Sequence, residues 1–197
     1  MLKSPHIYLA SRSSRRGELL GQIGVTFEVL PSDVNEDVLP DESPEHYVLR
    51  LAREKAAVCV QRLAAQGLPA KPVLAADTTV CIDGLILGKP ENDADAAAML
   101  RRMADRWHVV HTAIALADGE RVEVALSSTQ VEVAPLTEAE IAAYIASGEP
   151  RDKAGSYGIQ GLAGAFIRRI EGSYSGVMGL PVYETKQLLS KFGIRVL

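Results

Sequence analysis

The sequence predicts a mixed α/β protein, in which helices flank a sheet that contains both parallel and antiparallel strands. Strand-like apolar segments alternate with helical segments along the 197 residues, which is typical of α/β folds. Two Asp-Gly hairpin signals, at 83–84 and 118–119, interrupt this alternation and indicate antiparallel neighbours. Because no repeat or long linker divides the chain, we expect one domain over residues 1–197.

The first half of the chain is predicted to form four strands and two helices. Glycines end both helices, Gly24 after the first and Gly67 after the second. Ser43 is the expected N-cap of the second helix and Pro44 its first residue, after an acidic loop at 31–42. The predicted strands are 6–10, 25–30, 73–82 and 85–87, and the predicted helices are 17–23 and 44–66.

The second half is predicted to contain a long hairpin and three helices. Alternating residues indicate strands on both sides of the turn at 118–119. Thr137 and Glu140 have the spacing of a capping box, and Pro181 lies at the start of the last helix. Glycine-rich chain reaches Gly164. The predicted helices are 93–103, 137–147 and 180–191, and the predicted strands are 107–117, 121–133, 165–170 and a last one that closes the chain.

The composition excludes several classes of protein. A net charge of −4 argues against a nucleic-acid-binding protein, which is usually basic. No apolar run is long enough for a membrane span and residues 1–5 begin no signal sequence, so we expect a cytoplasmic protein without a membrane partner. Cys59 and Cys81 lie far apart in apolar segments without a histidine cluster, and we expect free thiols.

The polar segment at 11–16, between the first strand and the first helix, is the first candidate site. Backbone amides at the start of a helix attract anions. Ser11, Ser13, Arg15 and Arg16 add hydroxyl and guanidinium donors that suit phosphate. The alternative is an N-cap serine followed by solvated arginines, but four donors in one short turn favour the anion site.

Lys55 is a candidate because of its place on the long helix. It falls four residues after Leu51 and three before Val58, so it lies on the apolar stripe of that helix. A lysine there either points into a cleft, pairs with a carboxylate or extends its amine to water from the edge of the stripe. The helix alone does not decide between these alternatives.

Asp77 interrupts a segment, 73–82, that otherwise reads as a core strand. A buried carboxylate is costly unless a cation, a metal or hydrogen bonds compensate it. Desolvation also raises the proton affinity of a carboxylate, which suits a general base. The alternative is an aspartate that caps a neighbouring turn, and the burial cost favours a functional role.

Three further positions are weaker candidates. Lys89 precedes Pro90 in extended geometry just after the hairpin, where it either reaches the cleft or stays at the surface. Glu36 lies in the acidic loop and becomes a metal ligand only if that loop folds over Asp77. Gln160, in the glycine-rich segment 152–161, has an amide that can read a base edge, although an ordinary surface loop is the alternative.

Six motifs in this order resemble the Maf family, also called septum formation inhibitor-like proteins, and the resemblance runs essentially end to end. The motifs are YLASRSSRRGELL, LRLAREKA, AADTTV, GKP, HVVHTAIAL, and DKAGSYGIQG with GLP following. The resemblance implies an ITPase-like fold, with a mixed, strongly twisted sheet in two lobes around a central cleft. It also implies hydrolysis of nucleoside triphosphates between the α and β phosphates with a divalent metal, magnesium or manganese.

The resemblance further assigns roles to individual residues. Asp77 matches the proposed base that activates water, and Glu36 matches an acidic residue of the metal site. Lys55 and Lys89 match lysines that face the phosphates, while Ser11 and Arg16 belong to the phosphate loop. The metal is therefore expected on Glu36 and Asp77.

Substrate choice also follows from the resemblance. Arg15, Thr78 and Gln160 match positions that mark the subgroup acting on dTTP and UTP. Arg12 and Ser14 depart from the family pattern, which usually has a small or neutral residue and a proline there. Strict strand alternation puts Thr78 on the face opposite Asp77, so we expect a bulge or a strand end that lets both touch substrate.

Two other functions remain open from the sequence. The historical family name suggests a nucleotide-binding regulator of cell division without turnover, although a buried carboxylate beside lysines favours hydrolysis. An acid phosphatase that releases orthophosphate is the other alternative. The sequence leaves the oligomeric state open, and the resemblance makes a homodimer the expectation.

Overall fold

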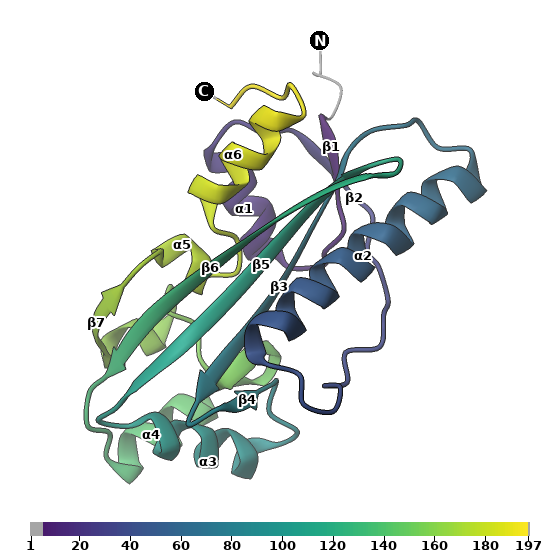
Figure 1. Cartoon of the computed structure of the whole chain (residues 1–197). Helices are drawn as coiled ribbons and strands as arrows, with labels where there is room; N and C mark the ends of the chain where they lie inside the picture. The colour runs from purple at the N-terminus through teal and green to yellow at the C-terminus, as the bar shows by residue number, and fades with distance from the viewer. Residues whose placement is uncertain (1–5, 197) are drawn as a thin grey trace.

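The computed structural model describes residues 6–196, which form one mixed sheet with helices packed on it (Figure 1). Seven strands are hydrogen-bonded in the order β2-β1-β3-β5-β6-β7, with β4 paired to β3. The strands are β1 (Ile7–Leu9), β2 (Phe27–Val29), β3 (Val73–Ile82), β4 (Leu85–Leu87), β5 (Trp107–Asp118), β6 (Arg121–Val133) and β7 (Ile167–Glu171). β1 pairs in parallel with β2 and β3, and the other pairs are antiparallel, so the predicted mixed α/β class is confirmed.

The helices begin and end close to the predicted positions. Ser43 caps the long helix by accepting from the backbone N–H of His46, and Gly67 ends it in the left-handed region with a φ of 60°. The capping box of Thr137 and Glu140 is also present. The helices are α1 (Ser14–Gln22), α2 (Pro44–Gln66), α3 (Asp93–Met103), α4 (Glu138–Ala146), α5 (Tyr174–Val177) and α6 (Val182–Lys191), with 3₁₀ turns at Glu149–Asp152, Ala154–Ser156 and Leu162–Phe166.

Three local expectations were wrong. The loop at 11–16 is shorter than expected, because α1 begins at Ser14 and carries Arg15 and Arg16 in its first turn. Residues 194–196 form no strand, since they pack on the core beside α6 without a pairing partner among the described residues. The short helix α5 was not expected. Residues 1–5, where a signal sequence was judged absent, and the end of the expected last strand at 197 lie outside the described residues.

Alternate residues of β3 pack on different helices. Val73 and Ala75 join the core beneath α2, whereas Leu74 and Ala76 join the core on the other face, with α1 and α6. Farther along the strand, Val80 contributes to a third core that includes residues of α3 and α4. Figure 1 shows α2 along one side of the sheet, α1 and α6 near β1, and α3 and α4 at the opposite end. None of the helices within residues 6–196 is long and apolar enough to cross a membrane.

One edge of β3 is uncovered midway along the strand. Pairing of β3 with β1 ends with the hydrogen bond from the backbone N–H of Ala10 to the carbonyl oxygen of Leu74. Pairing of β3 with β4 begins only at Val80. Between them, residues 76–79 pair with β5 on one side and with no described strand on the other. We call residues 76–79 the free edge of β3. A cleft opens beside it.

Candidate active site beside the free edge of β3

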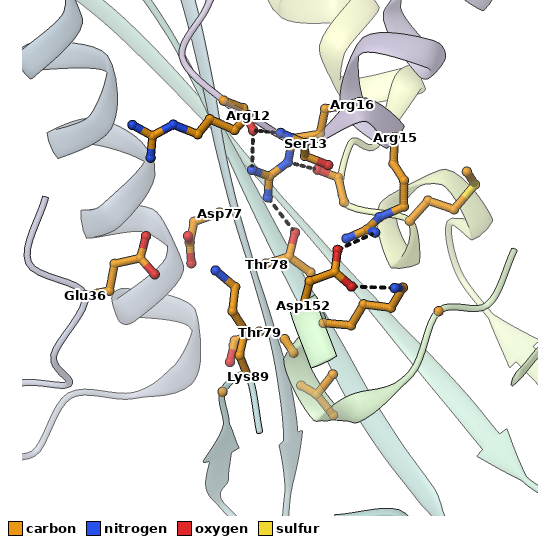
Figure 2. Close-up of a pocket in the computed structure, with 18 of the residues that line it drawn as sticks. Arg12, Ser13, Arg15, Arg16, Glu36, Asp77, Thr78, Thr79, Lys89 and Asp152 are labelled. Carbon is orange, nitrogen blue, oxygen red and sulfur yellow. Dashed lines mark hydrogen bonds and ion pairs between the residues drawn. The ribbon is translucent and has the colours of Figure 1, made fainter. Parts of the chain in front are cut away.

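The cleft has a volume of about 510 Å³ and brings together distant parts of the chain. Its walls come from the segment between β1 and α1, the loop before α2, the free edge of β3, and the segments around 152–160 and 177–179. All ten residues selected from the sequence line it: Ser11, Ser13, Arg15, Arg16, Glu36, Lys55, Asp77, Thr78, Lys89 and Gln160. Figure 2 shows most of these side chains converging on the same space.

Lys55 pairs with two carboxylates, which decides between the alternatives that its place on the helix left open. Its Nζ lies 2.6 Å from Asp77 Oδ1 and 2.6 Å from Glu36 Oε1. Lys55 and Asp77 are both buried, whereas the Glu36 side chain is half exposed. The acidic loop therefore does fold over Asp77, and it is held there because the Tyr47 hydroxyl donates to the carbonyl oxygen of Glu36 at 2.9 Å.

The two carboxylates of this cluster have opposite pKa shifts. Burial raises the pKa of Asp77 above its ordinary value, and the charges of Lys55 and Arg16 only partly oppose that effect. Burial also acts to raise the pKa of Glu36, but the hydrogen bond and charge of Lys55, with help from Lys89, outweigh it and the pKa of Glu36 is lowered. Asp77 is thus the carboxylate with the greater affinity for a proton, as a general base requires.

Arg16 is held in a different way, by neutral oxygen atoms. Its Nε donates to the carbonyl oxygen of Gly179 at 2.8 Å, Nη1 to Ser11 Oγ at 3.0 Å and Nη2 to Thr78 Oγ1 at 3.3 Å. Burial lowers the pKa of Arg16, with Asp77 acting in the opposite direction. Within residues 6–196 no carboxylate lies at ion-pair distance from Arg16, so its charge is available to an anion.

The start of α1 adds donors to the same wall. Ser13 occupies the N-cap position, but its hydroxyl makes no capping bond, and its backbone N–H donates to Ser11 Oγ at 3.2 Å. The first amides of a helix carry partial positive charge, which favours an anion in the cleft. Figure 2 shows Arg15 and Arg16 extending from this first turn toward the cleft.

Asp77 and Thr78 both border the cleft without a bulge or a strand end. The register between β3 and β5 is continuous here, with Asp77 opposite Ala113 and Thr78 opposite Thr112. Asp77 points to the α2 side, where it meets Lys55, and Thr78 points to the α1 side, where it meets Arg16. The expected irregularity was wrong, because a free strand edge lets a cleft reach both faces of the sheet.

The remaining selected residues lie at the rim. Arg15 Nη1 is 3.6 Å from Asp152 Oδ2, a carboxylate on the opposite wall. Lys89 is exposed, and Figure 2 shows it reaching into the cleft near Asp77. Gln160 is exposed and lines the cleft. Arg12, a departure from the family pattern, forms an exposed ion pair with Asp33 at 3.0 Å.

Two carboxylates of the cleft, Glu36 and Asp77, lie close enough together to share a divalent metal. Glu36 and Asp77 place carboxylate oxygens around one point, the Lys55 amine. Within residues 6–196 no group of three or more histidine, cysteine or acidic side chains is arranged for a metal. Magnesium commonly binds to one or two carboxylates together with substrate phosphates, so this donor set fits a metal completed by a substrate.

Comparison with known sequences agrees with the resemblance found from the motifs. The profile of a family described as "Maf-like protein" matches residues 6–192. The chain belongs to the Maf family. A relative from Methylobacillus flagellatus, named dTTP/UTP pyrophosphatase, is 62% identical over 96% of this chain and 94% of its own length. Relatives with the same name from Ralstonia nicotianae and Chromobacterium violaceum are 55% and 53% identical, each over 96% of this chain and over 95% and 96% of their own lengths.

Among solved structures, a more distant likeness is to the Ham1 protein of Staphylococcus aureus. The TM-score is 0.42 and the identity 18%, over 64% of this chain and 71% of that chain. A similarity of this size supports no comparison of sites.

Several residues that shape the cleft of this Maf protein were not selected from the sequence. Asp152 and Lys153 line it, and Lys153 donates to the carbonyl oxygen of Glu149 at 2.6 Å. Gly179 accepts the bond from Arg16, and Thr112 lies behind Thr78. A signal existed for Thr112, because it is a polar residue within an apolar strand, as Asp77 is. No comparable signal marked Gly179 as a partner of Arg16.

Proposed function

We propose that this Maf protein hydrolyses dTTP and UTP to the monophosphate and pyrophosphate. The names of the relatives support the substrates. The observation that carries the reaction is the arrangement of the cleft, where the buried Asp77, with its raised pKa, pairs with Lys55. Beside it lies the guanidinium of Arg16, which forms no ion pair within residues 6–196. Such a site offers a base for water and a cation for phosphate.

In this proposal Asp77 accepts the proton of the attacking water. Before the metal binds, the charge of Lys55 favours the ionised form of this carboxylate and fixes its direction, since the two groups are 2.6 Å apart. The oxygen of the water forms a bond to phosphorus, the bond between phosphorus and the oxygen that bridges the α and β phosphates breaks, and the released proton stays on Asp77 until it passes to solvent. Glu36 restrains Lys55 from the opposite side.

The cations of the cleft bind the triphosphate and stabilise the charge on the departing pyrophosphate. Arg16 and the first amides of α1 form one side of this binding surface, and Lys89 forms another. Arg15, Thr78 and Gln160 line the cleft beyond them and are proposed to contact the base. Arg16 and Thr78 are already hydrogen-bonded to each other, so the groups for phosphate and base adjoin.

A divalent cation, magnesium or manganese, is proposed to bind Glu36 and Asp77 together with the phosphates. Bound there, it would neutralise phosphate charge and lower the pKa of water. Glu36, whose pKa is lowered, stays ionised and offers its oxygens at neutral pH. Lys55 occupies the position between the two carboxylates in this structure, so we expect its amine to move when the metal binds.

The test is product analysis with dTTP, UTP and a divalent metal. We expect the monophosphate and pyrophosphate in equal amounts by anion-exchange chromatography, and loss of both on chelation of the metal. Hydrolysis in ¹⁸O-water will report which phosphorus atom is attacked. Release of orthophosphate would contradict the proposal in favour of a phosphatase, and tight binding without turnover would favour the regulator.

A further inference from the structure

A closed ring of hydrogen bonds lies behind the wall of the cleft that carries Thr78. Arg16 Nη2 donates to Thr78 Oγ1 at 3.3 Å, and Thr78 Oγ1 is 3.0 Å from Thr112 Oγ1. Thr112 donates to the carbonyl oxygen of Gly176 at 2.7 Å, which also accepts from the backbone N–H of Gly179 at 2.9 Å. The carbonyl oxygen of Gly179 accepts from Arg16 Nε at 2.8 Å, which closes the ring.

The direction of every bond in this ring is determined by its two ends. A guanidinium only donates and a carbonyl oxygen only accepts, whereas a threonine hydroxyl has one hydrogen and two lone pairs. Thr112 gives its hydrogen to Gly176, so it must accept from Thr78. Thr78 therefore gives its hydrogen to Thr112 and accepts from Arg16. The hydroxyl of Thr78 has no hydrogen left for a ligand.

The ring is tightly enclosed on the side away from the cleft. Thr112 is fully buried and does not line the cleft, whereas Thr78 is partly exposed and does. Gly179 has a φ of +107°, and a Cβ there would lie 3.5 Å from both Arg16 Nε and Thr78 Oγ1. A side chain at 179 would be strained by this φ, and its Cβ would lie in ordinary van der Waals contact with the ring.

We propose that Thr112 is a positioning residue that selects the nucleobase by making Thr78 a pure hydrogen-bond acceptor toward the cleft. Thymine and uracil carry a hydrogen on the ring nitrogen at position 3, which can donate to the free lone pair of Thr78. Cytosine has a lone pair at that nitrogen, so its ring nitrogen and the oxygen of Thr78 would be two acceptors that repel each other. This inference rests on the proposed function for its ligands and adds the reason for their selection.

The test compares Thr112→Val with Thr112→Ser. Valine keeps the shape of the threonine side chain but cannot accept a hydrogen bond. The hydroxyl hydrogen of Thr78 then loses its acceptor and can point into the cleft. Serine keeps the hydroxyl and should restore the wild-type behaviour. The matched control is Thr129→Val, because Thr129 is buried on β6 and bonds to Ser173, the residue just before α5, without belonging to the ring.

The measurement is the affinity for the α,β-imido analogues of UTP and CTP, by calorimetry with magnesium. We expect the wild type, Thr112→Ser and Thr129→Val to prefer the UTP analogue to the same degree. In Thr112→Val the ratio of the two affinities should fall by about three- to tenfold, the size expected for one hydrogen bond. Thr78→Val should weaken binding of the UTP analogue and leave that of the CTP analogue little changed.

Two results would overturn the inference. One is a wild type that binds both analogues equally, and the other is a Thr112→Val protein whose ratio stays at the wild-type value while its stability falls as that of Thr129→Val does. Failure of the proposed function is a separate outcome. A protein that discriminates between the analogues as expected but releases no pyrophosphate from UTP would disprove the proposed turnover and leave the role of Thr112 intact.

Discussion

The two cations at the centre of the cleft, Lys55 and Arg16, have opposite surroundings. Lys55 is buried and contacts two carboxylates at 2.6 Å each, so its charge is compensated within the protein. Arg16 donates to two hydroxyls and a carbonyl oxygen, and within residues 6–196 it forms no ion pair, although Asp77 and Glu36 act on its charge from farther away. The two side chains border the same free edge of β3, one on each face of the sheet.

The difference separates stability from binding. A buried ion pair is built into the folded state, and removal of one partner leaves an unpaired charge in a poorly hydrated place. A cation held by neutral groups contributes less to folding, but it retains most of its attraction for an anion. In the proposed reaction, the Lys55 side therefore serves proton transfer and the Arg16 side serves phosphate binding.

The largest expected effect comes from neutralising the base on the Lys55 side. Asp77→Asn keeps the size of the side chain and an oxygen near Lys55, but it cannot accept a proton from water. We expect kcat for pyrophosphate release from dTTP to fall about a thousandfold, with an unchanged circular dichroism spectrum. Activity near that of the wild type would show that another group activates the water.

A second prediction tests the difference between the two cations directly, by replacing each of them with methionine. Lys55→Met leaves Asp77 buried without its partner and should lower the free energy of unfolding in urea by about 3 kcal/mol. Arg16→Met should lower it by about 1.5 kcal/mol, yet it should weaken binding of the dUTP or dTTP imido analogue about 10- to 100-fold. Equal losses of stability in the two variants would contradict the distinction.

A third basic group, His108, sharpens the comparison because burial alone accounts for its pKa shift among the residues that the structure describes. Its Nε2 lies 2.7 Å from the Tyr157 hydroxyl, and burial lowers the pKa of His108 to about 4 from 6.5. The unfolded chain takes up this proton first as the pH falls, so acid favours unfolding between these two values. Between pH 7 and pH 5 the wild type should lose about 2 kcal/mol of stability through this residue.

The control for this effect is His108→Gln, which has no group that titrates in that range. Urea titrations of both proteins at pH 7, 6 and 5 would measure the slope. The variant is expected to be less stable at pH 7, and its stability should depend less on pH. Parallel slopes would mean that His108 is protonated in the folded protein.

The smallest effect is expected at the rim. Arg15 and Asp152 are 3.6 Å apart, and the Asp152 side chain is 69% exposed, so solvent screens the pair. Asp152→Asn should change the free energy of unfolding by less than about 0.5 kcal/mol. KM for dTTP should fall slightly, because Arg15 is released toward the substrate. A large loss of stability would show that Asp152 has a structural role through Lys153.

Most of the local structure could be predicted from the sequence, because capping and turn residues decide where helices and turns form. Ser43, Pro44 and Gly67 predicted both ends of α2, and Asp83-Gly84 predicted the hairpin of β3 and β4. Asp77 could be selected because a carboxylate in an apolar strand is conspicuous in the sequence itself. The strand predicted at the end of the chain is absent, because residues 194–196 fill the core beside α6 without a neighbouring strand among the described residues.

The contacts within the cleft were beyond the reach of sequence reasoning, because they join residues far apart in the chain. Arg16 bonds to Gly179, 163 residues away, and nothing in either segment indicates the other. The faces of Asp77 and Thr78 could be assigned from alternation, but the free edge that reconciles them depends on where β1 and β4 stop. Those ends are set by tertiary packing.

The free edge of β3 also has a consequence for the behaviour of the protein in concentrated solution. An uncovered strand edge has unpaired backbone groups, with which a strand of another molecule can pair and so start aggregation. Here charged side chains crowd the approach, with Asp77 and Lys55 on one side and Arg16 on the other. We expect the charged groups proposed to bind the nucleotide also to disfavour pairing of this edge with a strand of another molecule.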